Sequence, residues 1–238
     1  MSEIGRVRTQ IALSVVAGLM VMAIVMLGYR AEVEIADADR ALLSIALGAA
    51  YILGISMAMR PNRRARIGQG RHSGAGLSVE GRTLPGPPRK GHHPDCDTFR
   101  DHTITFSGRT RCAGCTGLTV GALVAILLTA MYGFDPSLVL WTNGPGLVIA
   151  GIALVALDLF AAMAGGLGPR AGLGLNALMM VGFTLVSVGL LESTGELTWG
   201  LVGVVNSALW MDTRIQVSRW NHVTLCMTCE MECAAYTL

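Results

Sequence analysis

Long apolar stretches recur along the whole chain, separated by shorter polar segments. Their bounds are 11–29, 41–59, 117–134, 144–165, 172–191 and 197–211. A helix that crosses a bilayer needs roughly 17 to 25 apolar residues. The first five stretches are long enough, whereas the sixth is marginal and could lie in the interface or be re-entrant. The pattern therefore predicts an all-α fold, a polytopic transmembrane bundle of about six helices.

The composition supports a membrane location. Of the 238 residues, 52% are hydrophobic and 14% are charged, whereas a soluble domain carries about 25% charged residues. A charge costs roughly 2.5 to 3.5 kcal/mol at the bilayer centre, so this deficit indicates contact with lipid. The first stretch exceeds the about 7 to 15 apolar residues of a signal peptide, and Tyr29-Arg30-Ala31 lacks a cleavage pattern. We therefore expect it to be a helix of the bundle.

Basic residues predict the orientation. Residues 60–116 hold 11 of the 18 basic residues, and basic loops stay in the cytoplasm. With six helices, only Arg30 and Arg40 fall outside, within an acidic link. The chain is thus predicted to be a multi-pass protein of the cell membrane with both termini cytoplasmic. Nucleic acid is not an expected partner, because the basic loop lacks interleaved aromatic residues.

Five regions follow from these patterns. They are an N-terminal transmembrane hairpin (1–60), a flexible basic Gly/Pro linker (61–90), a cytosolic Cys/His module (91–116), a four-helix membrane unit (117–212) and a cytosolic Cys-rich tail (213–238). Gly117 and Gly121 form a Gly-x3-Gly pair, which permits two helices to pack closely. Such Gly-rich helices are also compatible with assembly alongside other membrane subunits.

The Cys/His module has the spacing of a four-ligand metal site. His93-x2-Cys96 is followed, after 15 residues, by Cys112-x2-Cys115, and two-residue gaps let neighbouring ligands reach one metal ion. Thiolate and imidazole ligands favour zinc first, and then iron or an iron–sulfur cluster. Paired cysteines in the cytosol are more often ligands or redox groups than structural disulfides.

Other interpretations of the module remain open. His92 or His102 could replace His93 as a ligand. Cys112 and Cys115 could instead be an inert reduced pair at a helix start, or a thiol–disulfide couple.

A second Cys/His group closes the chain. The tail after residue 211 contains neither Pro nor Gly and is compatible with a helix, on which His222, Cys226, Cys229 and Cys233 form one stripe. Such a stripe could form a second metal site, share ligands with the loop module, hold a ferredoxin-type cluster, or pack as small apolar side chains.

Asp158 lies in the middle of the fourth apolar stretch. An ionisable group at membrane depth suggests a functional role, here a proton or cation relay, a counter-ion or a structural acceptor. Asn176 and Asn206, in the two following stretches, are its expected partners.

One string of residues carries a family resemblance. It comprises Cys96, Phe106, Gly108 and Cys112-Ala113-Gly114-Cys115-Thr116-Gly117, followed by Leu157-Asp158-Leu159 and Asn176. In this string the chain resembles a prokaryotic integral membrane protein family (domain of unknown function 2085) over about 100 residues. The chain departs from that family's motif at Asp97, Thr98 and Gly114. The resemblance implies a membrane fold and the pairing of Cys96 with the later cysteines, and it implies no activity.

Three functions follow from these features. The first is a membrane protein with a cytosol-facing Cys/His metal site, structural or metal-handling and most simply zinc. The second is a membrane thiol–disulfide oxidoreductase that uses Cys112 and Cys115. The third is a transporter or accessory subunit that uses Asp158. The sequence contains no phosphate-binding glycine loop, serine nucleophile elbow or zinc-protease motif that would indicate a common enzyme class.

Overall fold

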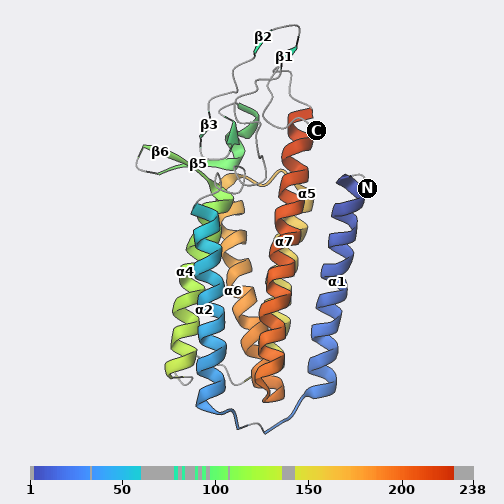
Figure 1. Cartoon of the computed structure of the whole chain (residues 1–238), viewed down its shortest axis with the longest axis vertical. Coiled ribbons are helices and arrows are strands. Elements are labelled where there is room, and N and C mark those ends of the chain that lie inside the picture. The colour runs from blue at the N-terminus through green and yellow to red at the C-terminus, as the bar shows by residue number, and fades with distance from the viewer. Residues whose placement is uncertain are drawn as a thin grey trace.

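The chain forms a bundle of long helices with a small β-containing segment at one end (Figure 1). The computed structural model describes residues 3–32, 34–59, 78–79, 82–83, 89–90, 93–94, 97–106, 108–135 and 143–227. The helices in these residues are α1 (Glu3–Gly28), α2 (Asp37–Met59), α4 (Ala113–Phe134), α5 (Gly144–Ala164), α6 (Pro169–Thr194) and α7 (Leu197–Met227). The all-α helical bundle predicted from the apolar pattern is confirmed.

Short strands lie between α2 and α4. Three antiparallel pairs join β1 (Ser78–Val79) to β2 (Arg82–Thr83), β3 (Arg89–Lys90) to β4 (His93–Pro94), and β5 (Thr103–Phe106) to β6 (Arg109–Cys112). A 3₁₀ helix, η1 (Asp97–His102), precedes β5. The β5–β6 hairpin leads directly into α4, so it fixes the start of that helix.

The helices run alternately up and down along one axis. α1 begins and α7 ends at the same end of the bundle, and the β5–β6 hairpin lies at that end too (Figure 1). We call it the hairpin end, and the opposite end, where α1 is linked to α2 and α6 to α7, the far end. The start of α1, the end of α7 and the β5–β6 hairpin therefore share one end of the bundle (Figure 1).

Five of the described helices, all except α7, are long and apolar enough to cross a membrane. The chain is therefore a multi-pass membrane protein. α7, with 31 residues, runs beside them along the same axis (Figure 1), but it carries Asp212, Arg214 and Arg219 along its second half. It continues without a break through residues 212 and 213, so the boundary expected there between membrane unit and tail lies inside a helix.

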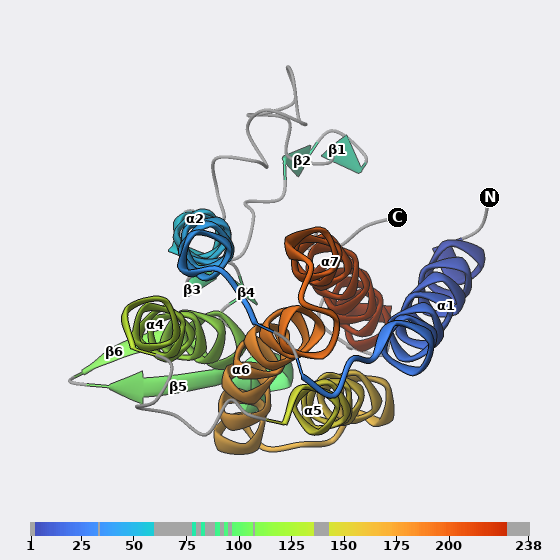
Figure 2. The same cartoon turned by 90° about the horizontal axis from the view of Figure 1, so that it is seen from below.

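α6 is the central helix, with α4, α5 and α7 around it (Figure 2). The Gly-x3-Gly pair of α4 explains one of these contacts. A Cβ atom on Gly117 would lie 2.3 Å from the carbonyl oxygen of Leu173, and one on Gly121 would lie 2.5 Å from the Cα of Ala177. The two backbones therefore approach as closely as glycine permits, as the spacing predicted.

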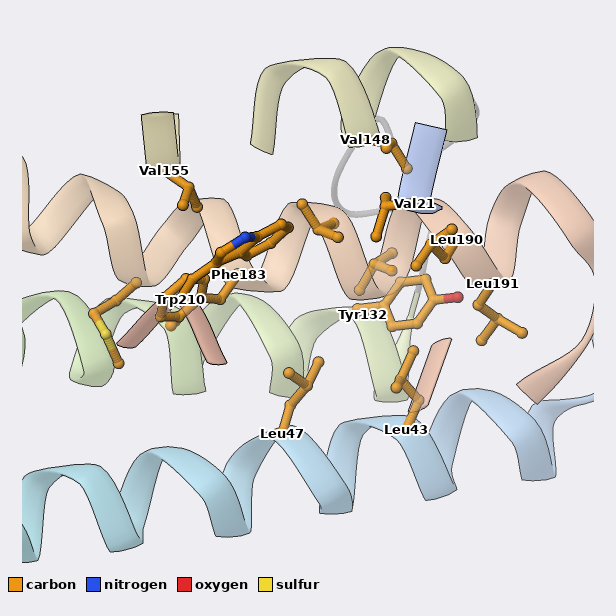
Figure 3. Packing of buried hydrophobic residues seen from close by; sticks show 14 of the residues in the cluster. Val21, Leu43, Leu47, Tyr132, Val148, Val155, Phe183, Leu190, Leu191 and Trp210 are labelled. Atoms are coloured by element: carbon orange, nitrogen blue, oxygen red, sulfur yellow. The ribbon is translucent and has the colours of Figure 1, made fainter. Parts of the chain in front are cut away.

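Large apolar side chains fill the space between the helices (Figure 3). Leu43 and Leu47 of α2 and Tyr132 of α4 are almost fully buried in one cluster with residues of α6. Toward the hairpin end, the rings of Phe183 and Trp210 stack with centroids 6.3 Å apart. Burial of this kind closes the bundle along most of its length.

The first two helices have different neighbours. α1 is tied to α7, because Trp210 Nε1 donates to the Ser14 carbonyl at 3.1 Å and the Ser14 and Thr213 hydroxyls are 2.6 Å apart. α2 packs mainly against α4, and Figure 2 shows the two N-terminal helices apart. Within the described residues, the two helices of the region 1–60 therefore pack mainly against different helices of the bundle.

Candidate Cys/His pocket

Cys112 is held by the junction between a hairpin and a helix. Gly108 makes the turn of the β5–β6 hairpin with φ of 72°, a left-handed conformation that favours glycine. Cys112 pairs with Thr103 at the end of this hairpin and is also the N-cap of α4. Its Sγ accepts a hydrogen bond from the backbone N–H of Cys115 at 3.4 Å. The thiol of Cys112 therefore faces the first turn of α4, which carries Cys115.

Two histidines meet beside this hairpin. His102 ends η1 and directly precedes Thr103, the partner of Cys112. His222 lies in the last turns of α7, and the ring centroids of the two histidines are 5.3 Å apart. Phe99, 1% exposed, lies 5.8 Å from the His102 ring and 5.4 Å from the His222 ring. An aromatic contact thus joins the segment before the hairpin to α7.

These side chains surround a pocket of about 480 Å³ at the hairpin end of α2, α4, α6 and α7. We call it the Cys/His pocket. Its polar lining consists of His102, Cys112, Cys115, Asn176, Arg214, Ser218, Arg219 and His222. The remaining lining is glycine or apolar, and includes Met57, Leu118 and Met180. Every cysteine and histidine whose side chain the structure describes lines this one pocket.

A buried ion pair lies behind the pocket wall. Arg214 Nε donates to Asp158 Oδ2 at 2.8 Å, and the side chains are 16% and 2% exposed. Asp158 is on α5 and does not line the pocket, whereas Arg214 does. The expected partners of Asp158 are therefore wrong. Asn176 donates to the Gly172 carbonyl at 2.6 Å, and the buried Nδ2 of Asn206 finds no partner among the described residues.

Several predicted ligands cannot be compared with this pocket. His92, Cys96, Cys229 and Cys233 lie outside the described residues. For His93 in β4 and Cys226 in α7, the structure gives the backbone element and not the side chain. The described residues contain no group of three or more Cys, His, Asp or Glu side chains that converge on one point. Neither predicted four-ligand set is therefore tested.

Sequence reasoning left out three of the residues that build this site. Phe99 is a single aromatic residue in a polar segment, and its burial shows its role. Arg214 and Arg219 are two basic residues near the end of the chain, and the structure places both at the pocket. Their spacing from His222 gave a usable signal, because residues 214, 218 and 222 follow one another at i, i+4 and i+8 and share one face of a helix.

Searches of protein-family models, curated proteins and solved structures found no match to this chain. The resemblance carried by Cys96 and the Cys112–Gly117 string thus stays a prediction. The residues of the pocket and their chemistry are the basis for a functional proposal.

Proposed function

We propose that this membrane protein binds a soft metal ion, most simply Zn²⁺, in the Cys/His pocket. The observation that carries the proposal is that four soft donors from separate segments line one pocket: Cys112 at the end of β6, Cys115 of α4, His102 of η1 and His222 of α7. Two thiolates and two imidazoles form a donor set typical of structural zinc.

Charge supports this choice of ion. Two thiolates neutralise one divalent cation, so a site with two cysteines and two histidines carries no net charge. The adjacent ion pair of Asp158 and Arg214 is neutral as well. A neutral site costs far less at the end of a membrane helix than an uncompensated divalent ion does.

Metal binding requires a local rearrangement. The four side chains line the pocket walls without converging, so rotations about their χ angles would have to bring them together. His93 or Cys96 could replace one of them, as the spacing of the module predicts. One site shared by the loop and α7 is better supported than two separate sites, because His222 faces the same pocket as Cys112 and Cys115.

We assign the hairpin end to the cytoplasm. The assignment depends on the positive-inside rule, since 11 of the 18 basic residues lie between residues 60 and 116. In that compartment thiols stay reduced and are available as ligands. The site would then pin the loop before α4 to the end of α7, in a structural or metal-handling role.

Elemental analysis of the purified full-length chain tests the proposal. The protein is prepared under anaerobic, reducing conditions, beside the variants Cys112→Ser/Cys115→Ser and His102→Ala/His222→Ala. Ser218→Ala is the matched control, because Ser218 lines the pocket and is not a proposed ligand. We expect one zinc ion per chain in the wild type and the control, and loss of zinc in both double variants. A folded wild type without metal, or double variants that keep their zinc, would overturn the proposal.

A second candidate is a membrane thiol–disulfide oxidoreductase. It is favoured by the closeness of the Cys112 Sγ to the first turn that carries Cys115, beside a pocket with many apolar walls. A lipid-soluble quinone would be the electron acceptor. The two thiols would give up two electrons and two protons, forming one disulfide, while the quinone becomes a quinol.

Anaerobic mixing with a short-chain benzoquinone separates the two candidates. The redox function predicts quinol formation with an equal amount of Cys112–Cys115 disulfide, in a protein that contains no metal. It also predicts that Cys112→Ser folds normally and forms no quinol. A metal site predicts a protein that contains metal and forms no quinol. It also predicts that Cys112→Ser is less stable than the wild type, because metal binding contributes directly to folding free energy.

A further inference from the structure

The Cys/His pocket is larger than a metal site requires. Its volume of about 480 Å³ falls within the roughly 300 to 1,000 Å³ of small-molecule pockets. A four-coordinate ion has ligands about 2.0 to 2.3 Å away and would occupy one part of this space. The pocket therefore has room for another occupant beside a metal ion.

The guanidinium of Arg214 is the charged group on these walls that can anchor a ligand. Arg214 lines the pocket, and no carboxylate is among the described residues that do so. The facing surfaces of α2, α4 and α6 contribute Met57, Leu118 and Met180. A guanidinium opposite apolar walls matches a ligand with an anionic head and an apolar body.

The guanidinium of Arg214 is well placed to bind such an anionic head group. Asp158, buried on the far side of the guanidinium, engages Nε at 2.8 Å. Within the described part of the chain Asp158 is the hydrogen-bond partner of Arg214, so both Nη groups remain for a ligand. A planar guanidinium fixed from behind can donate two parallel hydrogen bonds to a carboxylate or phosphate. The same contact prevents the long side chain from collapsing out of position.

We propose that the Cys/His pocket binds an amphipathic oxyanion, a carboxylate or phosphate on an apolar chain, with Arg214 as its anchor. The proposal stands independently of the metal, because none of the proposed zinc ligands supplies the anchor. Such a ligand could be a membrane lipid with an anionic head group or a soluble organic anion with a short apolar chain.

Calorimetry on the full-length chain in phosphatidylcholine nanodiscs tests the anchor. The probes are octyl phosphate, octyltrimethylammonium with the same chain and opposite charge, and inorganic phosphate. We expect octyl phosphate to bind at least about tenfold more tightly than either of the others, a difference typical of a hydrogen bond to a charged group. Equal binding of the two octyl compounds would overturn the proposal.

Variants of Arg214 test whether octyl phosphate binds in this pocket. Arg214→Gln keeps a donor for Asp158 and removes the cation, so octyl phosphate should bind about tenfold or more weakly. Arg170→Gln is the matched control, since Arg170 lies in the first turn of α6 and does not line the pocket, and it should bind as the wild type does. If Arg214→Gln folds poorly, Arg214→Lys supplies a second test, with weaker binding expected because an ammonium lacks the fork geometry. Unchanged affinity in both variants would overturn the assignment.

Two further arms separate the alternatives. Metal-free Cys112→Ser/Cys115→Ser protein should still bind octyl phosphate if Arg214 is the anchor. If the metal-free variant does not bind octyl phosphate while Arg214→Gln binds it fully, the metal holds the anion and the proposal is refuted.

Lipid mass spectrometry distinguishes the two kinds of ligand. More phosphatidic acid bound to the wild type than to Arg214→Gln would confirm the site with a lipid as ligand. Octyl phosphate binding without that enrichment would confirm it with a soluble anion.

Discussion

Charged side chains are arranged differently at the two ends of the bundle. At the far end, Arg30 pairs with Glu196 at 3.1 Å, and Arg40 lies 3.2 Å from Asp37 and 3.9 Å from Glu192. At the hairpin end, arginines, histidines and cysteines line a pocket in which no described lining residue is a carboxylate. Both described arginines of the far end thus pair with carboxylates of the chain. At the hairpin end, Arg214 uses its Nε for the buried Asp158, so its Nη groups can also serve a ligand in the pocket.

This contrast separates structural polar groups from functional ones. Tyr132 donates to Glu192 at 2.6 Å, and the backbone N–H of Arg30 donates to the Ser193 carbonyl at 3.0 Å. These contacts tie neighbouring helices together where the chain turns. Variants at the far end should therefore change stability and leave metal content unchanged, whereas variants in the pocket should change metal or anion binding.

The largest stability effect is expected from Arg214→Leu. It leaves the Asp158 carboxylate, 2% exposed, without its ion-pair partner, and breaking one side of a buried pair costs about 3 to 5 kcal/mol. Thermal unfolding in detergent measures the loss. The double variant Asp158→Leu/Arg214→Leu should recover most of it. A double variant as unstable as the single one would show that packing, and not the orphaned charge, causes the loss.

Gly121→Ala should have the next largest effect. The added Cβ would meet the backbone of Ala177 at 2.5 Å, so α4 and α6 must separate just below the pocket. Overpacking of this kind costs about 1 to 3 kcal/mol, and we expect the upper part of that range because the obstacle is backbone. Gly48→Ala on α2 is the matched control, since nothing lies within 4 Å of its new methyl group. That control should be neutral or stabilising by up to about 1 kcal/mol.

Tyr132→Phe probes the far end alone. It removes the hydroxyl that donates to Glu192 at 2.6 Å, and a hydrogen bond to a charged group contributes about 1.5 to 3 kcal/mol. We expect the lower value, because Arg40 remains near the carboxylate at 3.9 Å. Chemical unfolding gives the free energy, and elemental analysis of the same sample should give unchanged zinc. A loss of zinc in this variant would contradict the proposal that changes at the far end leave the pocket unaffected.

Glu196→Gln should have the smallest effect. Its pair with Arg30 has side chains that are 50% and 64% exposed, and exposed pairs contribute only about 0.2 to 1 kcal/mol. Salt screens such pairs, so the difference from wild type should vanish when unfolding is repeated at high ionic strength. A larger loss that persists in salt would indicate that Arg30 has a structural role beyond this pair.

Much of the fold follows from the apolar pattern. Spanning helices must satisfy all backbone groups within the helix, and so each long apolar stretch predicted one helix correctly. The absence of Pro and Gly after residue 211 was compatible with the helical extension that carries His222. The Gly117 and Gly121 spacing predicted a close helix contact without naming α6 as the partner.

The site was harder to predict because it depends on how helices rotate about their axes. Asp158 and Arg214 are 56 residues apart, and nothing in either helix alone shows that they face each other. His102 approaches Cys112 through the register of a hairpin whose strands have four residues each, a pattern too short to stand out in a polar loop. Contacts between distant segments, and not local propensity, assemble the pocket.

Zinc-edge X-ray absorption of the anaerobic, full-length protein tests the central claim most directly. A Cys/His pocket that binds zinc predicts a first shell of two sulfur atoms at about 2.3 Å and two nitrogen atoms at about 2.0 Å. Replacement of His222 by alanine should reduce the nitrogen contribution or abolish binding. A shell of four sulfur atoms, or one unaffected by His222→Ala, would mean that the metal is held elsewhere and would contradict the account.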